Sequence, residues 1–173
     1  AVGRHFNGTA YQTLAEHWNG TAWTKVVSPN PAGPSKAAAF FSVVTTSSSN
    51  AWAVGTYCNG SAFQALVAHW DGTAWNRVAS PSPGSYPTLY AVAATSATNA
   101  WAVGSYNDKS SSKTLIEHWD GTAWHQVASP SPDASPRGGP LLYGVAATSA
   151  NNAWAVGNYY NPTLKKTLTL VLH

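Results

Sequence analysis

Two short strings recur along the chain at a nearly constant interval, and this repetition restricts the fold more than any other feature. The string Ala-Trp-Ala-Val-Gly stands at 51–55, 100–104 and 153–157, with its last three residues also at 1–3. The string His-Trp-Asn/Asp-Gly-Thr-Ala-Trp stands at 17–23, 69–75 and 118–124. Successive copies are 49 to 53 residues apart. We therefore expect stacked copies of one supersecondary unit, because a single unit of this size cannot bury its own hydrophobic face.

Each unit contains four short runs that favour β-strands. In the third copy of the unit they cover residues 89–95, 100–106, 114–119 and 123–128, and we name them strands A, B, C and D. Their content of Val, Trp, Tyr and Thr suits the pleated surface of a sheet.

Turn signals join these runs into an antiparallel meander. Asn-Gly or Asp-Gly between C and D predicts a two-residue type I′ hairpin turn. Ser-Ala-Thr-Asn at 96–99 predicts another tight turn between A and B. Ser-Pro-Ser-Pro after D removes backbone donors and should end pairing there.

Strands A and B are apolar on both faces, which indicates that each sheet is covered by a neighbour on either side. The sequence thus predicts an all-β protein, a β-propeller of four-stranded antiparallel blades of about 50 residues, with about three blades per chain. Solenoids and β-helices have shorter repeats and are less favoured. Trp52, Trp101 and Trp154 should then lie between blades, where full burial contributes roughly 2–3 kcal/mol each.

The whole chain, residues 1–173, is expected to be one repeat domain. Its parts are a partial blade B-C-D at 1–36, full blades at 37–83 and 84–132, and a partial blade A-B-C at 133–173. The last run, 167–173, allows two registers. Without gaps, Leu170-Val171-Leu172 replaces Glu-His-Trp; with a loop two residues longer, His173 is the repeated histidine.

Three blades cannot close a ring, because propellers have four or more. An open arc would expose apolar faces larger than a soluble monomer tolerates. We therefore expect self-association, in which the last A–B of one chain completes the first C–D of another to give a six-bladed homodimer. A fragment of a longer single-chain propeller is the competing explanation.

The strings Ala-Thr-Ser-Ala-Asn-Asn-Ala-Trp-Ala-Val-Gly (147–157) and Leu-Ile-Glu-His-Trp-Asp-Gly-Thr-Ala-Trp (115–124) resemble a Trp-rich propeller repeat of secreted or surface proteins of soil bacteria, chiefly actinobacteria. The resemblance extends over essentially the whole chain and implies a propeller, with no established activity. A looser resemblance, in architecture and Trp content, is to propeller lectins, and no sugar-binding motif carries over. The chain lacks the paired glycines of kelch repeats and the Ser-x-Asp-x-Gly of sialidase aspartate boxes.

Composition excludes several classes of protein. Charged residues make up 9% of the chain, against about a quarter in ordinary domains. The few Lys and Arg are scattered, so no nucleic-acid interface is expected. No apolar run approaches the ~20 residues of a membrane span. The single cysteine, Cys58, and the absence of Cys/His spacing predict neither a disulfide nor a metal site. A polar surface rich in Trp indicates an extracellular or cell-surface location.

No catalytic group is evident, so the sequence predicts a protein that is not an enzyme and needs no cofactor. The carboxylates form no evident pair for glycoside hydrolysis: they are Glu16, Asp71, Asp108, Glu117, Asp120 and Asp133. No serine lies in a Gly-x-Ser-x-Gly elbow, and no glycine loop could hold a phosphate. His17, His69 and His118 share one strand-C position, and we expect each ring nitrogen to bond to a neighbouring backbone group. His5, His125 and His173 have no evident partner.

The variable segments are the B–C and D–A connections, which a meander places at one end of the strands. Loops on a rigid scaffold commonly carry recognition. The B–C loops have an aromatic residue soon after the strand-B glycine (Phe6, Tyr57, Tyr106, Tyr159) with asparagines nearby. A flat ring beside amides suits a sugar. The predicted ligand-binding residues are Tyr57, Asn59, Tyr106, Asn107, Tyr159 and Asn161.

The expected function is therefore weak, multivalent carbohydrate binding by a secreted, lectin-like protein. An alternative is that the tyrosines merely finish strand B and cover the blade edge. The protein would then be a structural or protein-interaction scaffold, and a hydrolase or lyase is the third choice.

Overall fold

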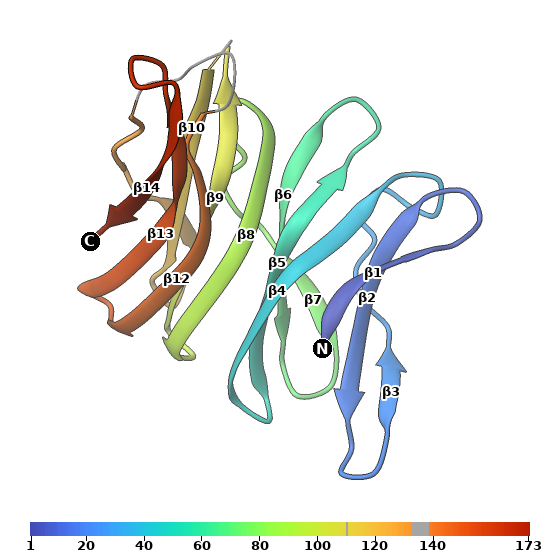
Figure 1. Ribbon diagram of the computed structural model, residues 1–173. Helices are drawn as coiled ribbons and strands as arrows, with labels where there is room; N and C mark the ends of the chain where they lie inside the picture. Colours follow the sequence, from blue (N-terminus) through green and yellow to red (C-terminus); the bar gives the residue numbers. More distant parts are fainter. Residues whose placement is uncertain (110, 133–138) are drawn as a thin grey trace.

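The structure is a computed structural model that describes residues 1–109, 111–132 and 139–173. Its 14 strands form four antiparallel sheets (Figure 1), and the described residues contain no helix. The all-β, antiparallel prediction is therefore confirmed. Most of the variable connection 133–140, and with it Asp133, lies outside the described residues.

Each sheet is a meander whose strands follow one another in chain order. The first sheet consists of β1 (Val2–Phe6), β2 (Tyr11–Trp18) and β3 (Trp23–Val26). The second consists of β4 (Ala38–Ser47), β5 (Asn50–Cys58), β6 (Phe63–Trp70) and β7 (Trp75–Val78). The third consists of β8 (Ser85–Ser96), β9 (Asn99–Asp108), β10 (Ser111–Trp119) and β11 (Trp124–Gln126). The fourth consists of β12 (Leu141–Ser149), β13 (Asn152–Asn161) and β14 (Lys166–Leu172).

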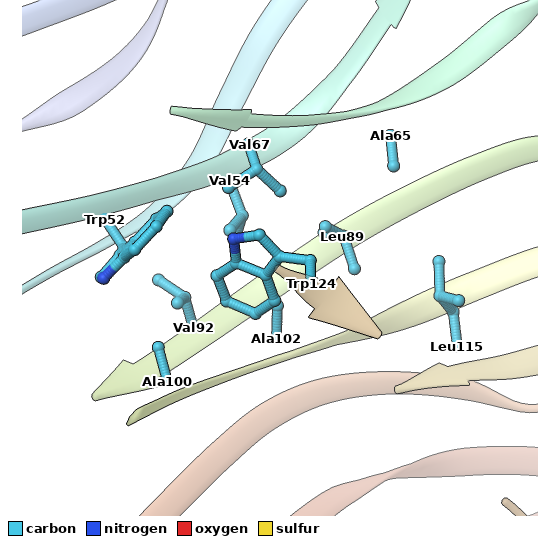
Figure 2. Close-up of a cluster of buried hydrophobic side chains, with 10 residues drawn as sticks. All are labelled: Trp52, Val54, Ala65, Val67, Leu89, Val92, Ala100, Ala102, Leu115 and Trp124. Atoms are coloured by element: carbon cyan, nitrogen blue, oxygen red, sulfur yellow. The ribbon is translucent and has the colours of Figure 1, made fainter. Parts of the chain in front are cut away.

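The sheets pack face against face in chain order, and the first strands β4, β8 and β12 lie next to one another. A separate apolar cluster fills each of the three interfaces between sheets. Figure 2 shows the middle cluster, where Trp52 and Val54 of the second sheet meet Leu89 and Trp124 of the third. The apolar residues on the two faces of strands A and B thus pack against the neighbouring sheets on either side.

The glycine of Ala-Trp-Ala-Val-Gly is required by a close approach between strands. A Cβ on Gly55 or Gly104 would lie 1.9 Å from the carbonyl oxygen of Ala39 or Thr88, on the strand-A neighbour. Just beyond this contact a β-bulge inserts one residue into strand A. Gly3 holds the same motif position, but β1 pairs only with β2, and nothing lies within 4 Å of its Cβ direction.

The residues inserted by the bulges form a ladder of aromatic rings across three sheets. Phe41, Tyr90 and Tyr143 are the extra residues of β4, β8 and β12. Their ring centroids are 5.7 Å apart from Phe41 to Tyr90 and 5.5 Å from Tyr90 to Tyr143. Tilted pairs at this distance are favourable, so the ladder ties the first strands together.

The C–D hairpins differ from the predicted type I′ turn. Trp18 pairs with Trp23, which leaves a loop of four residues, and Gly20 has a positive φ whereas Asn19 does not. Instead, Asn19 Oδ1 accepts hydrogen bonds from the N–H groups of Thr21 and Ala22. The type I′ prediction was wrong because this side-chain oxygen fixes the turn without a second positive φ.

The same loop in the second sheet carries an aspartate. Hydrogen bonds from the Thr73 hydroxyl and from the N–H groups of Ala74 and Thr73 lower the pKa of Asp71 to about 2.

The Ser-Pro segments do more than end strand D. In the third sheet β11 stops at Gln126, and the segment then continues in the same direction along the edge of β10. Ser131 Oγ accepts a hydrogen bond from Thr114 N, and the Thr114 hydroxyl donates to the Pro130 carbonyl. Side chains thus continue the pairing where the prolines cannot.

The two terminal sheets contain the same central strands, which bears on ring closure. β1 and β13 are both strand B, and β2 and β14 are both strand C. One blade shared between two chains would therefore require two of these four strands to leave their sheets.

Replacing Gly104 tests the close approach. We expect Gly104→Ala to lower the free energy of unfolding by about 1–3 kcal/mol or more, because β8 must move to relieve the contact with Thr88. Gly3→Ala is the matched control and should change it by less than about 0.5 kcal/mol. Urea unfolding measures both, and equal losses would contradict the account of the motif.

Candidate functional site

The long connections gather at one end of the sheets, which we name the loop face. The Asn7 side chain donates to the Pro34 carbonyl and the Gln12 side chain donates to the Lys36 carbonyl, both at 2.8 Å, so a B–C loop meets a D–A connection. The tight turns meet at the opposite end, where Trp70 Nε1 donates to the Ser48 carbonyl.

Tyr57 and Asn59, both predicted to bind ligand, have structural contacts. Tyr57 is only 6% exposed and belongs to the core between the first and second sheets. Arg77 donates to its hydroxyl at 2.7 Å and lies over its ring. Asn59 Oδ1 accepts hydrogen bonds from the N–H groups of Ser61 and Ala62, so it stabilises the B–C turn.

The other predicted residues lie at the corresponding places of their own sheets. Tyr106 and Tyr159 are partly buried and pack against the apolar clusters that face the preceding sheet. Asn161 Oδ1 accepts from Leu164 N, and Asn107 pairs through its backbone with Ser85 and Ser112. The six residues do not converge on one site; each sheet holds its own Tyr and Asn.

The accessible aromatic rings of the loop face form two pairs, none of whose members is among the six predicted ligand-binding residues. Phe63 and Tyr86 lie 5.5 Å apart at 30°, and Phe6 and Tyr11 lie 5.6 Å apart. Tyr86 is 61% exposed. The sequence feature that could have pointed to the Phe63–Tyr86 pair is the tyrosine inside the variable segment Gly-Ser-Tyr-Pro at 84–87.

Tyr86 is held in an unusual backbone conformation. Its φ is 54°, a region that bulky residues rarely adopt and that costs on the order of 1–3 kcal/mol. The next residue, Pro87, is fully buried, and the Thr88 hydroxyl donates to the Tyr86 carbonyl at 3.3 Å. This arrangement points the Tyr86 ring outward beside Phe63, which presents aromatic surface to solvent.

A polar pocket of about 440 Å³ also opens near the loop face of the third sheet. Its lining includes Tyr106, Lys113, Gln126 and Ser129. Ring, amide, ammonium and hydroxyl groups there provide the mixture of contacts that binds a hydroxylated ligand.

Of the repeated histidines, His69 and His118 belong to the scaffold, although their bonding partner differs from the prediction, whereas His17 is exposed. His69 Nε2 lies 2.6 Å from Asn50 Oδ1, and its ring centroid lies 4.4 Å from that of Trp52 at a tilt of 42°. His118 repeats this with Asn99 and Trp101. The expected backbone acceptor was wrong because strand B supplies an asparagine amide two residues before the tryptophan that pairs with each histidine. Burial lowers the pKa of His69 and His118, which favours the neutral, donating ring.

The last strand follows the register with the longer loop. Leu170 pairs with Gly157 as Leu66 pairs with Gly55. His173 then lies 2.9 Å from Asn152 Oδ1 and stacks on Trp154, so it is the repeated histidine.

Glu117 is a buried carboxyl group with no evident structural partner. It is fully buried between the second and third sheets, and among the described residues neither oxygen has a hydrogen-bond partner of good geometry. Burial raises its pKa to about 8, which the Ser80 hydroxyl opposes only in part. The corresponding residues are Glu16, Ala68 and Leu172, so two of the four copies do without an acid there.

No group of three or more His, Cys, Asp or Glu within the described ranges could hold a metal ion. Within the same ranges no helix is long and apolar enough to cross a membrane. No protein-family model matches the sequence, and no curated protein matches it significantly.

The buried acid predicts a pH-dependent stability. Because the folded pKa of Glu117 is about 8 and its ordinary value is 4.5, the unfolded chain releases this proton first as the pH rises. The free energy of unfolding should then fall between about pH 5 and pH 8, by up to ~1.4 kcal/mol per pH unit. Glu117→Gln should remove this fall.

Urea unfolding of both proteins at several pH values measures the difference, in which the other titrating groups cancel. The variant should be the more stable protein at pH 8, with the gap closing toward pH 5. Parallel stability curves would show that Glu117 is ionised in the folded state.

Proposed function

We propose that the four stacked sheets are blades of a β-propeller. Antiparallel meanders of three or four strands that pack face to face, with the first strands β4, β8 and β12 adjacent, support this arrangement. The resemblance to the Trp-rich bacterial repeat points the same way, and with it we propose a secreted or cell-surface protein.

We further propose that the protein binds carbohydrate through its loop face. The observation that carries this proposal is the Phe63–Tyr86 pair, since a strained, solvent-exposed tyrosine beside a second ring has no role in the core. Sugars stack their apolar faces on aromatic rings, and nearby hydroxyl and amide groups can bond to their hydroxyls. The polar pocket beside Tyr106 offers a second contact of this kind.

A protein-interaction scaffold is the second candidate. It is favoured by the structural contacts of Tyr57 and Asn59, which leave these two side chains little freedom to bind a ligand. The same exposed rings would then bind a protein surface.

Self-association is the partner proposal that accompanies the propeller. The terminal sheets expose apolar side chains, among them Trp18, Trp23, Trp154 and Val156. A second copy would cover them and complete a homodimeric ring, with six blades if the terminal sheets share strands.

A glycan array with the full chain tests carbohydrate binding. We expect specific signals that Tyr86→Ala reduces at least about tenfold, since loss of one stacking ring costs on the order of 1.4 kcal/mol. Tyr106→Ala should also weaken binding. Tyr143→Ala is the matched control, because Tyr143 is half-exposed but belongs to the aromatic ladder.

A blank array at high protein concentration would reject carbohydrate binding and favour the scaffold. Binding that survives Tyr86→Ala and Tyr106→Ala together would place the sugar site elsewhere.

A further inference from the structure

The interface between the second and third sheets shows how two neighbouring sheets recognise each other. The ring of Trp52 lies 4.9 Å from that of Trp119 and 5.2 Å from that of Trp124. Trp52 comes from strand B of one sheet, whereas Trp119 and Trp124 flank the C–D turn of the next. As a result Trp52 is only 2% exposed.

In neither of the two flanking interfaces of the described chain does a strand-B tryptophan pack against two hairpin tryptophans of the next sheet. A pocket of about 320 Å³ between the first and second sheets is lined by the hairpin residues Trp70 and Trp75, and Trp18 and Trp23 of the first sheet also border it. A pocket of about 490 Å³ between the third and fourth sheets is lined by the strand-B residue Trp101 and bordered by Trp154 of the fourth sheet. Where all three tryptophans are present, their rings lie against one another, as Figure 2 shows for Trp52 and Trp124.

The outer face of the fourth sheet, which is turned away from the third sheet, presents the strand-B residues of such an interface. Ala155 and Leu170 pack toward the third sheet, so alternation turns Trp154, Val156 and Val171 away from it. These three are 49%, 45% and 52% exposed. They correspond to Trp52, Val54 and Val67, which lie in the middle core.

The outer face of the first sheet, which is turned away from the second sheet, presents the C–D hairpin tryptophans of such an interface. Val2 packs toward the second sheet and pairs with Ala15, so alternation along β2 turns Leu14 and Trp18 the other way. Trp18 and Trp23 hold the positions of Trp119 and Trp124 and are 48% and 56% exposed.

We propose that a second copy of this chain docks its first sheet on the outer face of the fourth, with Trp154 packed against the partner copy's hairpin tryptophans as Trp52 packs on Trp119 and Trp124. This inference rests on the self-association proposed above and replaces strand sharing by face-to-face docking. All six terminal strands then stay in their sheets. The contact is head-to-tail, and a closed dimer contains it twice.

Light scattering on size-separated protein tests the docking. The full chain should run at twice the 18.2 kDa of one chain, or at higher multiples if the contacts do not close. Trp154→Glu and Trp23→Glu should each give a monomer. Each variant alters one of the two surfaces at every junction, the contact between the first sheet of one copy and the fourth sheet of another. Tyr143→Glu, an equally exposed ring outside both faces, is the control and should leave the mass unchanged.

A mixture of the two variants separates this proposal from other dimers. The Trp154→Glu chain keeps its first-sheet face and the Trp23→Glu chain keeps its fourth-sheet face, so together they should recover a dimer through one junction. A self-associated wild type whose mass neither variant changes would overturn the docking surface and leave self-association intact. A monomeric wild-type protein would overturn both the docking surface and the proposed self-association. If that monomer still bound glycans, carbohydrate binding would not depend on self-association.

Discussion

The fold depends on the packing of indole rings between neighbouring sheets. A meander of this length cannot bury its own faces, and with 9% charged residues it cannot leave them in water either. Trp52 helps to bury apolar surface of two sheets at once, because its ring contacts those of Trp119 and Trp124 across the interface. On its own sheet the His69 ring packs against it at a tilt of 42°, and the hydrogen bond to Asn50 fixes that histidine.

Much of the fold follows from the repeat, because repeated residues such as Gly55 and Gly104, or His69 and His118, make the same contacts in their own sheets. Period and strand content predict the sheets, and the glycine of the first string marks the close approach to strand A. Two local details escaped prediction. The C–D loop has four residues because the Asn19 or Asp71 side chain replaces a backbone donor–acceptor pair, which Asn-Gly alone does not reveal. The partner of His69 and of His118 is an asparagine 19 residues earlier, a distance set by strand pairing.

The candidate site was harder to predict than the fold. Tyr57 stands in a variable loop and has the right chemistry, yet strand alternation turns it toward the preceding sheet, where Arg77 covers it. Tyr86 is exposed because Pro87 is buried beside it and the backbone takes a positive φ. Neither orientation can be deduced from residue type. The pattern predicts at which end of the sheets the variable loops lie, whereas the side chains that reach solvent there depend on tertiary packing.

The most direct test of the account is a double-mutant cycle between Trp52 and Trp124, read by equilibrium unfolding of Trp52→Leu, Trp124→Leu and the double variant. These rings lie in different sheets, so their coupling energy measures the contact between sheets and not the stability of either sheet alone. The account predicts a favourable coupling of about 0.5–1.5 kcal/mol. Strictly additive losses would mean that the two indoles do not touch in solution, which would contradict the stacking of the sheets.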